Sequence, residues 1–309
     1  MSETVIVVGS CMTDLIGYVP CLPKPGETLH GTKFLVGFGG KGANQAVMAA
    51  KLGSNTALIA KLGNDAFGTN YMENLINVGV DVSNVGRVEG ASGVAMITVD
   101  ENAENCITII GGANNQLSKA DINNGRDVFA SGKVLVLQME VPLETNLAAL
   151  KLSKQINEKM ITVFNAAPAT DSLPTELYHL VDIFCVNESE AEKLLGISSV
   201  RTIEEAGYAA DLLIKNGCKI GMITLGANGV VYKEQGSGDL VHVSCPKVNA
   251  IDTTGAGDAF IGCLASLIAN DDVSLSVSFK RKVEIACNVA SNSVTKLGTQ
   301  TSYPTSYDC

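Results

Sequence analysis

The chain has 309 residues, of which 46% are hydrophobic and 17% charged, so it can bury a large core as one domain with or without a small accessory sheet. Its formal net charge of −10 argues against nucleic acid or an anionic membrane surface as partners, although backbone N–H groups and Mg²⁺ can still hold a nucleotide. Its nine cysteines are scattered, no signal peptide opens the chain, and no apolar stretch approaches the roughly 20 residues of a membrane-spanning helix. We therefore expect a cytoplasmic protein with reduced thiols.

Short apolar runs recur along the chain, and each is typical of a parallel strand buried on both faces. They lie at residues 5–8, 57–60, 134–137, 161–164, 183–186 and 222–225. Helices are expected at residues 43–52, 67–78, 143–157, 188–195 and 203–216. This alternation predicts a three-layer α/β/α, Rossmann-like fold with a mostly parallel central sheet, formed by residues 1–309 as a single domain.

Two stretches interrupt the alternation. Residues 15–38 contain three prolines and no helical pattern, and residues 93–110 are typical of a hairpin that turns near residues 100–102. Together they predict a small sheet that stands off the main one. Beside the strand ends, such a sheet would act as a lid.

The first candidate motif is the glycine-rich segment 37–45, which opens a predicted helix. Residues 37–42 satisfy the G-x-G-x-x-G pattern of dinucleotide-binding loops, but they follow an extended stretch and not a buried strand. The segment is not a Walker A loop either, because Lys41 is followed by Gly42 and not by Ser or Thr. It is either a structural turn or a close approach of the backbone to a ligand, with Lys41 and Asn44 beside it.

The second motif, residues 252–260, places small residues before Asp258 and an apolar helix. Free N–H groups at a helix start bind anions, and the helix dipole favours negative charge there. This arrangement suits a phosphoryl group in transfer, and Asp258 could accept a proton from the attacking hydroxyl. Alternatively Asp258 caps the helix, which would explain the Asp but not the Gly-Ala-Gly before it.

Two further segments follow predicted strands. Asn187 and Glu190 have the spacing of a capping box, or they organise Mg²⁺ and phosphate at the carboxyl edge of the sheet. Residues 224–229 end on Asn-Gly, which indicates a hairpin, but these small residues would also form a flat shelf for a nucleotide.

Two acidic residues, Asp14 and Glu140, lie just beyond apolar runs of the sequence. Each is either a solvated loop acid or part of a cleft for hydroxyl groups. If both strands end at the same edge of the sheet, the two carboxylates line one cleft.

Together these motifs resemble the ribokinase family of carbohydrate kinases, which also includes fructokinases and adenosine kinases. The resemblance covers nearly the whole chain and rests on segments in the family's order at residues 9–14, 25–28, 39–45, 112–114, 165–169, 187–190, 224–226 and 252–258. Residues 39–45 and 112–114 are most similar to the members that phosphorylate ribose. The resemblance implies ATP-dependent phosphorylation of D-ribose at its 5-hydroxyl, with fructose, deoxyribose or adenosine as alternative acceptors.

The resemblance also implies residue roles. Asp258 would be the catalytic base, and the amides of Gly255, Ala256 and Gly257 would form an anion hole for the γ-phosphate. The residues that would bind the sugar are Met12, Thr13, Asp14, Gly40, Lys41, Gly42, Ala43, Asn44, Glu140 and Asp258. Those that would contact ATP are Asn187, Thr224, Leu225, Gly226, Ala227, Asn228, Gly229, Gly257, Asp258 and Cys287.

Cofactors and assembly follow from the same resemblance. Asn187 and Glu190 would position Mg²⁺ and phosphate, and the lid would pair two subunits as a homodimer. K⁺ would act as a monovalent activator, held by Asp252, Thr254, Ser293, Lys296, Gly298 and Ser302, several of them through backbone carbonyls. The chain departs from relatives at Met12, where some have Asn, and at Cys287, where they carry His or Asn near adenine.

Two other classes of function stay open from the sequence. A sugar- or nucleotide-binding regulator on a kinase fold is one, although the intact Asp258 and the segment 255–257 argue against it. A dehydrogenase that uses residues 37–42 is the other. Among kinases, an adenosine kinase fits less well, because a purine acceptor needs an aromatic pocket and only 5% of the residues are aromatic.

Overall fold

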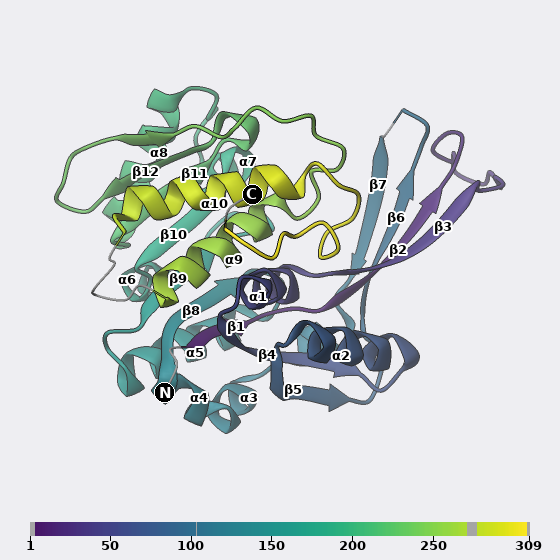
Figure 1. Cartoon of the computed structure of the whole chain (residues 1–309), viewed down its shortest axis with the longest axis horizontal. Coiled ribbons are helices and arrows are strands. Elements are labelled where there is room, and N and C mark those ends of the chain that lie inside the picture. Colours follow the sequence, from purple (N-terminus) through teal and green to yellow (C-terminus); the bar gives the residue numbers. More distant parts are fainter. Residues whose placement is uncertain (1–3, 103, 271–276, 308–309) are drawn as a thin grey trace.

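The computed structural model describes residues 4–102, 104–270 and 277–307, and within them the strands form two sheets (Figure 1). The larger sheet has nine strands. In spatial order they are β13 (Val241–Val243), β12 (Val230–Glu234), β11 (Ile220–Thr224), β10 (Ile183–Asn187), β9 (Ile161–Asn165), β8 (Gly132–Gln138), β1 (Thr4–Val8), β4 (Asn55–Gly63) and β5 (Asp81–Val88). The pairs from β11 to β5 are parallel, and β12 and β13 add an antiparallel edge.

Helices cover both faces of this sheet. One face packs against α1 (Lys41–Lys51), α2 (Ala66–Val78), α9 (Ala256–Ala269) and α10 (Phe279–Ser293). The other packs against α3 (Lys119–Asn124), α4 (Arg126–Ser131), α5 (Leu143–Ile156), α6 (Thr175–Leu180), α7 (Glu188–Leu195) and α8 (Ile203–Asn216). In β1, Val5 and Val7 enter the first core while Ile6 and Val8 enter the second, which explains the unbroken apolar run. The three-layer prediction is confirmed.

The smaller sheet projects from the main body (Figure 1). Its order is β3 (Lys33–Gly39), β2 (Met12–Tyr18), β6 (Gly93–Val99) and β7 (Asn105–Ile110). The β6–β7 hairpin occurs where the sequence indicated one, and the extended segment provides β2 and β3. Asp14 lies on β2 and is buried, so of its two interpretations that of a solvated loop acid is wrong. Its carboxylate lies against Gly39 at the end of β3.

Several elements are not among those expected from the sequence. They are β5, β12, β13, α3, α4, α6, α10 and two short 3₁₀ helices, Gly112–Gln116 and Gly226–Asn228. Of these, α10 carried a readable signal, because its buried Val283, Ala286 and Cys287 repeat at helical spacing. The short helices give too few turns for periodicity to be seen.

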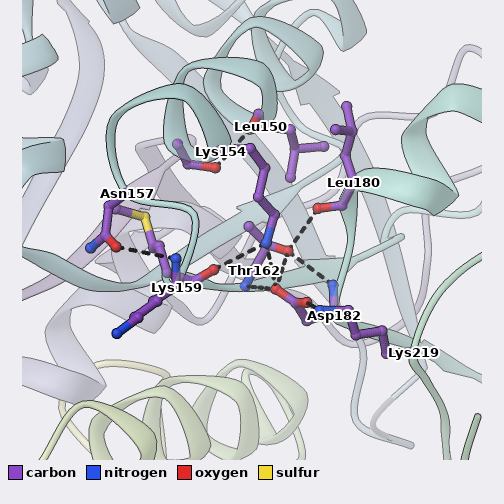
Figure 2. Close-up of polar contacts among 10 residues, drawn as sticks. Leu150, Lys154, Asn157, Lys159, Thr162, Leu180, Asp182 and Lys219 are labelled. Carbon is purple, nitrogen blue, oxygen red and sulfur yellow. Dashed lines mark hydrogen bonds and ion pairs between the residues drawn. The ribbon is translucent and has the colours of Figure 1, made fainter.

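An ion cluster joins the amino ends of three strands of the main sheet (Figure 2). We call this end of the strands the amino edge of the sheet, and the opposite end the carboxyl edge. The Asp182 carboxylate accepts hydrogen bonds from the Thr162 backbone N–H (2.8 Å) and hydroxyl (2.9 Å) and from Lys154 Nζ (2.8 Å), and it pairs with Lys219 Nζ (2.6 Å). The Asp182 backbone donates to the carbonyl of Thr162 and accepts from Ile220, so this residue joins the starts of β9, β10 and β11. The carboxyl ends of these strands are thereby fixed in register.

None of the described helices is long and apolar enough to cross a membrane. The eight cysteines in the described ranges are free thiols, and five of them are buried. The five buried cysteines pack as small apolar side chains, as expected.

Candidate active site

Two adjoining cavities lie at the carboxyl ends of β10 and β11, beside the start of α9. The smaller has a volume of about 160 Å³ and is lined by Lys41, Glu190 and Asp258, among others. The larger has a volume of about 610 Å³, which is in the range of small-molecule sites. They share the lining residues Asn187, Thr224, Thr253, Ala256 and Gly257. A ligand in one cavity therefore contacts the same helix start as a ligand in the other.

The start of α9 is shaped by Gly255. This residue has φ 77°, and a side chain on it would meet Thr299 and the Tyr303 hydroxyl. That hydroxyl donates to the Gly255 carbonyl (3.0 Å). Gly255 is the N-cap residue, so the interpretation of Asp258 as the cap is wrong. First-turn amides of a helix have no helical acceptor, and the exposed Gly257 leaves open space beside them for an anion.

The Asp258 carboxylate, 5% exposed, is held by two side-chain amides from α1. Asn44 Nδ2 donates to Oδ2 and Gln45 Nε2 donates to Oδ1, each at 2.9 Å. Gln300 Nε2 donates to Asn44 Oδ1 (3.0 Å), and Gln138 Nε2 donates to Gln45 Oε1 (2.7 Å). These outer amides fix the oxygen ends of the inner ones, so both inner NH₂ groups must face Asp258.

The glycine-rich segment is a close contact between the start of α1 and the end of β1. Gly40 has φ 90°, and a side chain there would meet Met12 N at 2.7 Å and Ser10 O at 2.9 Å. A side chain on Gly42 would meet the backbone of Ser10. The preceding strand, β3, belongs to the small sheet and is antiparallel to β2, so no βαβ unit surrounds the segment. The structural context for a dinucleotide-binding loop is absent from this described region.

Glu140 lies outside α1, and its carboxylate accepts hydrogen bonds at the start of this helix. Its Oε2 accepts hydrogen bonds from the Lys41 backbone N–H (2.7 Å) and the Ser10 hydroxyl (2.5 Å). Burial raises the pKa of Glu140 more than these two donors lower it, and the charge of Asp258 adds to the rise. Glu140 therefore helps to position Lys41 and does not extend freely into solvent.

Asp14 and Lys41 complete the charged part of the site. Burial raises the pKa of Asp14 to about 6, and the charge of Glu140 contributes. Burial also opposes the charge of Lys41, but Asp258, Glu140 and Glu190 outweigh it and raise the pKa of this ammonium group. One cation thus faces several carboxylates.

Asn187 and Glu190 confirm the first of the two interpretations that the sequence left open. They form a capping box, in which Asn187 Oδ1 accepts from the Glu190 N–H and Glu190 Oε2 accepts from the Asn187 N–H, both at 2.8 Å. Both also line the smaller cavity. In the described part of the chain, no three His, Cys, Asp or Glu side chains converge as a metal cluster. This donor set fits Mg²⁺, which commonly takes one or two protein oxygens and completes its shell with phosphates and water.

The segment 224–229 has the hairpin geometry that its Asn-Gly pair indicated. It is the turn of the antiparallel β11–β12 hairpin, and Thr224, Gly226, Ala227 and Gly229 line the larger cavity. Leu225 instead packs in the core. The carbonyl of Asn228 bonds to the ring of His242 (2.8 Å), while Cys287 lies in the cavity wall as expected.

Several other predicted residues lie apart from the cavities. On β2, Thr13 faces away from the side that carries Asp14, and within the described structure its buried hydroxyl has no hydrogen-bond partner. Met12 is buried beside Gly40, and Ala43 is buried in α1. None of these three residues lines either cavity.

The residues expected around K⁺ lie in a part of the chain that is held by internal hydrogen bonds. Asp252 accepts from the backbone N–H groups of Thr254 and Gly298, each at 2.9 Å. The Ser293 and Ser302 hydroxyls donate to the carbonyls of Ala290 and Thr299, and Lys296 is exposed. Side chains therefore stabilise this loop, and oxygen ligands for a cation would come mainly from its carbonyls.

Sequence reasoning missed three site residues. Gln45 stood inside a recognised motif, but its role was assigned to its neighbours, and Gln138 and Gln300 lie far from any motif. Only their convergence on Asn44 and Asp258 in the structure reveals them.

A buried carboxylate in a cavity at the start of a helix, where free backbone amides can bind an anion, is the arrangement that transfer of a phosphoryl group to a hydroxyl requires. The fold and site thus define a kinase that acts on small molecules. The model of the pfkB family carbohydrate kinases matches residues 2–306, and the chain belongs to this family. The prediction of a sugar kinase is confirmed.

The individual relatives are likewise named as sugar kinases. The chain is 43% identical to the ribokinase of Mus musculus over 305 residues, which cover 98% of this chain and 92% of the relative. It is 40% identical to the deoxyribokinase of Salmonella typhi, over 97% of this chain and 95% of that one. Its fold matches Arabidopsis thaliana ribokinase complexed with ribose and ATP, with a TM-score of 0.88, 29% identity and coverage of 98% and 96%.

Proposed function

We propose that the chain transfers the γ-phosphoryl group of ATP to the 5-hydroxyl of D-ribose, giving ribose 5-phosphate and ADP. The observation that carries this proposal is the place of Asp258, bonded to α1 on one side and lining the smaller cavity at the start of α9. The mouse relative is named ribokinase, and the Arabidopsis structure contains ribose and ATP.

In this proposal the sugar binds between the small sheet and the start of α1. Asp14, Lys41, Asn44 and Glu140 bind its hydroxyls, with backbone groups of Gly40, Gly42, Ala43, Met12 and Thr13 completing the wall. Asp258 accepts the proton of the attacking hydroxyl. Its orientation is set in advance by the amides of Asn44 and Gln45, which reduces the reorganisation needed during the reaction.

The nucleotide occupies the other side of the helix start. The larger cavity, with its floor of small residues at Thr224, Gly226 and Ala227 and its wall at Cys287, receives the nucleoside. The phosphates reach the smaller cavity, where the amides of residues 255–257 stabilise the charge that develops on the transferred group. Lys41 lies in the same cavity and adds a positive charge.

Two cations accompany this chemistry. Kinases that use ATP need a divalent metal, and Asn187 and Glu190 would hold Mg²⁺ together with the phosphates, whose charge it would neutralise. The loop that Asp252 organises, with Thr254, Ser293, Lys296, Gly298 and Ser302, would hold K⁺ through its carbonyls and so support the anion hole beside it.

The small sheet would act as a lid and pair with the same sheet of a second copy. One of its faces exposes Phe34 (63%), Val36 (55%), Met96 (53%) and Ile110 (46%), an apolar surface typical of an interface. We expect a dimer in sedimentation velocity and a monomer for Met96→Lys. Glu73→Lys on α2, outside the lid, is the control and should stay dimeric. A monomeric wild type would contradict the pairing.

A coupled assay of ADP release tests the proposed substrate. With Mg²⁺, K⁺ and ATP, kcat/KM should be higher for ribose than for deoxyribose, fructose or adenosine, and mass spectrometry should identify ribose 5-phosphate. Deoxyribose is the main alternative, because the 40% identical relative is named deoxyribokinase. A higher kcat/KM for deoxyribose would select that activity, and no sugar-dependent ADP release would contradict both.

A further inference from the structure

Two thiols meet in the wall of the larger cavity. Cys245 lies in the loop that follows β13, and Cys287 lies on α10, one turn before Ser291. The sulfur of Cys245 accepts hydrogen bonds from the Cys287 thiol and the Ser291 hydroxyl. Cys287 is 1% exposed, whereas Cys245 is partly exposed. One thiol of the pair is thus accessible to solvent, and the other is buried.

The groups around the pair make the two thiols chemically different. The hydrogen bond from Cys287 lowers the pKa of Cys245 most, burial opposes this effect, and Ser291 and the nearby His242 reinforce it, leaving the pKa at about 7. The same bond, together with burial and the charges of Cys245, Cys263 and Glu284, raises the pKa of Cys287. Near pH 7, about half of Cys245 is therefore thiolate, which is the nucleophilic form, while Cys287 keeps its proton.

We propose that Cys245 is a modification site for hydroperoxides in the wall of the nucleotide pocket, and that Cys287 captures its oxidised form as a disulfide which blocks the pocket. The effect on activity rests on the proposed function, since it requires that the larger cavity holds the nucleotide. The chemistry at the two sulfurs does not.

The reaction balances with a hydroperoxide as the oxidant. The Cys245 thiolate attacks one peroxide oxygen, the O–O bond breaks, and the leaving oxygen takes up a proton, so that Cys245 becomes a sulfenic acid. The sulfur of Cys287 then attacks the Cys245 sulfur and loses its proton, and hydroxide leaves as water. Overall the two sulfurs lose two electrons, and hydrogen peroxide is reduced to two molecules of water.

Such a bond would change the shape of the pocket. The loop after Cys245 continues with Pro246, Lys247 and Val248, which line the same cavity. A sulfur–sulfur bond requires an approach closer than the thiol–thiol hydrogen bond, so this loop must move toward α10. Since α10 packs in the core, most of the movement falls on the loop, into the space proposed for the nucleotide.

The test uses the reduced full-length chain treated with hydrogen peroxide near pH 7. Peptide mapping should find a Cys245–Cys287 disulfide, and MgADP affinity measured by calorimetry should fall at least tenfold and recover with dithiothreitol. Alkylation of Cys245 by iodoacetamide should have its rate midpoint near pH 7 and be slowed by MgADP. Cys21→Ser removes an exposed thiol far from the cavity and should change none of these results.

Two substitutions of Cys287 separate its roles. Cys287→Ser keeps a hydroxyl donor, so Cys245 should still ionise near pH 7, but oxidation should stop at a sulfenic acid that dimedone traps. Cys287→Ala removes the donor as well, so the alkylation midpoint should move above pH 8 and the rate at pH 7 should fall roughly tenfold.

Two outcomes would overturn the inference: peroxide that modifies Cys21 or Cys106 before Cys245, or a disulfide that leaves MgADP affinity unchanged. Kinase activity of the untreated chain with ribose tests the proposed function separately. Failure of that activity would not alter the mapped sulfur chemistry.

Discussion

Buried carboxylates lie at both ends of the strands of the main sheet, its amino edge and its carboxyl edge. The two ends differ in how the charges of these carboxylates are balanced. At the amino edge, Asp182 is matched by Lys154 and Lys219 and by the donors of Thr162. Burial alone would raise the pKa of Asp182, but these partners outweigh it and lower that pKa. At the carboxyl edge, the charge of Lys41 is set against those of Glu140, Glu190 and Asp258, while burial and the charge of Glu140 raise the pKa of Asp14.

This difference in charge balance suits two different roles, a structural one at the amino edge and a functional one at the carboxyl edge. A cluster that only has to hold strands together can satisfy every charge, as at Asp182. The carboxyl edge instead keeps raised pKa values at Asp14, Glu140 and Glu190, a cost in folding that suits a site whose remaining partners are ligands and cations. Changes at the two edges should therefore have different consequences.

The largest effect is expected at the carboxyl edge. Asp258→Asn keeps the shape of the side chain but removes the proton acceptor, so kcat should fall by about 10²–10⁴ while the KM for ribose changes little. Steady-state kinetics measure both quantities. Turnover at the wild-type rate would exclude Asp258 as the base.

A substitution at the amino edge should lower the stability of the fold and leave the activity nearly unchanged. Asp182→Ala removes the shared acceptor and leaves the half-buried Lys154 and the Thr162 N–H without it, so unfolding should become easier by about 3 kcal/mol. Urea denaturation measures this loss, and kcat should stay close to wild type below the transition. Lys233→Ala, which breaks the more exposed pair with Asp211, is the matched control and should cost less than about 1 kcal/mol.

The amides behind Asp258 should give an intermediate effect on rate. Gln45→Leu removes one donor to the carboxylate, so kcat should fall roughly 10–100-fold through misplacement of the base. Gln138→Leu acts only through Gln45 and should cost less. A larger loss for Gln138 than for Gln45 would contradict this order, and equal urea midpoints of the two variants would show that folding is not the cause.

The smallest effects are in the pH dependence of stability, where the two edges should differ in sign. The lowered pKa of Asp182 makes it stabilise the fold above its unfolded pKa near 4, and this contribution is lost as pH falls through the lower folded pKa. The pKa of Asp14, raised to about 6, makes ionisation unfavourable in the folded state, so stability is lost as pH rises from about 4 to 6. Asp14→Asn should therefore gain on the order of 2 kcal/mol over wild type across that interval. Urea midpoints from pH 4 to 7 measure it, and a constant difference would contradict the assignment.

Much of the architecture could be predicted from local pattern, because strands buried on both faces are continuous apolar runs and their helices alternate with them. The same holds for residues that belong to motifs, such as Lys41, Asn44 and Asp258. Asp14 was misplaced because the sequence does not show that its strand joins a second sheet. Gln138, Gln300 and Asp182 were missed because their partners lie far along the chain, and a lone polar residue in a sequence does not reveal which distant donor it meets.

The amide of Gln300 reaches back to Asn44 and to the Tyr71 hydroxyl, and its own backbone carbonyl accepts from Lys51. The hydrogen bond from Gln300 to Asn44, beside the proposed base Asp258, therefore joins residues 256 positions apart in the sequence. On the ribosome, a growing chain can build the strands and most helices of this protein before it can orient Asn44. Catalytic competence should thus arise late in synthesis, only once residue 300 has left the exit tunnel, so that nascent chains do not consume ATP.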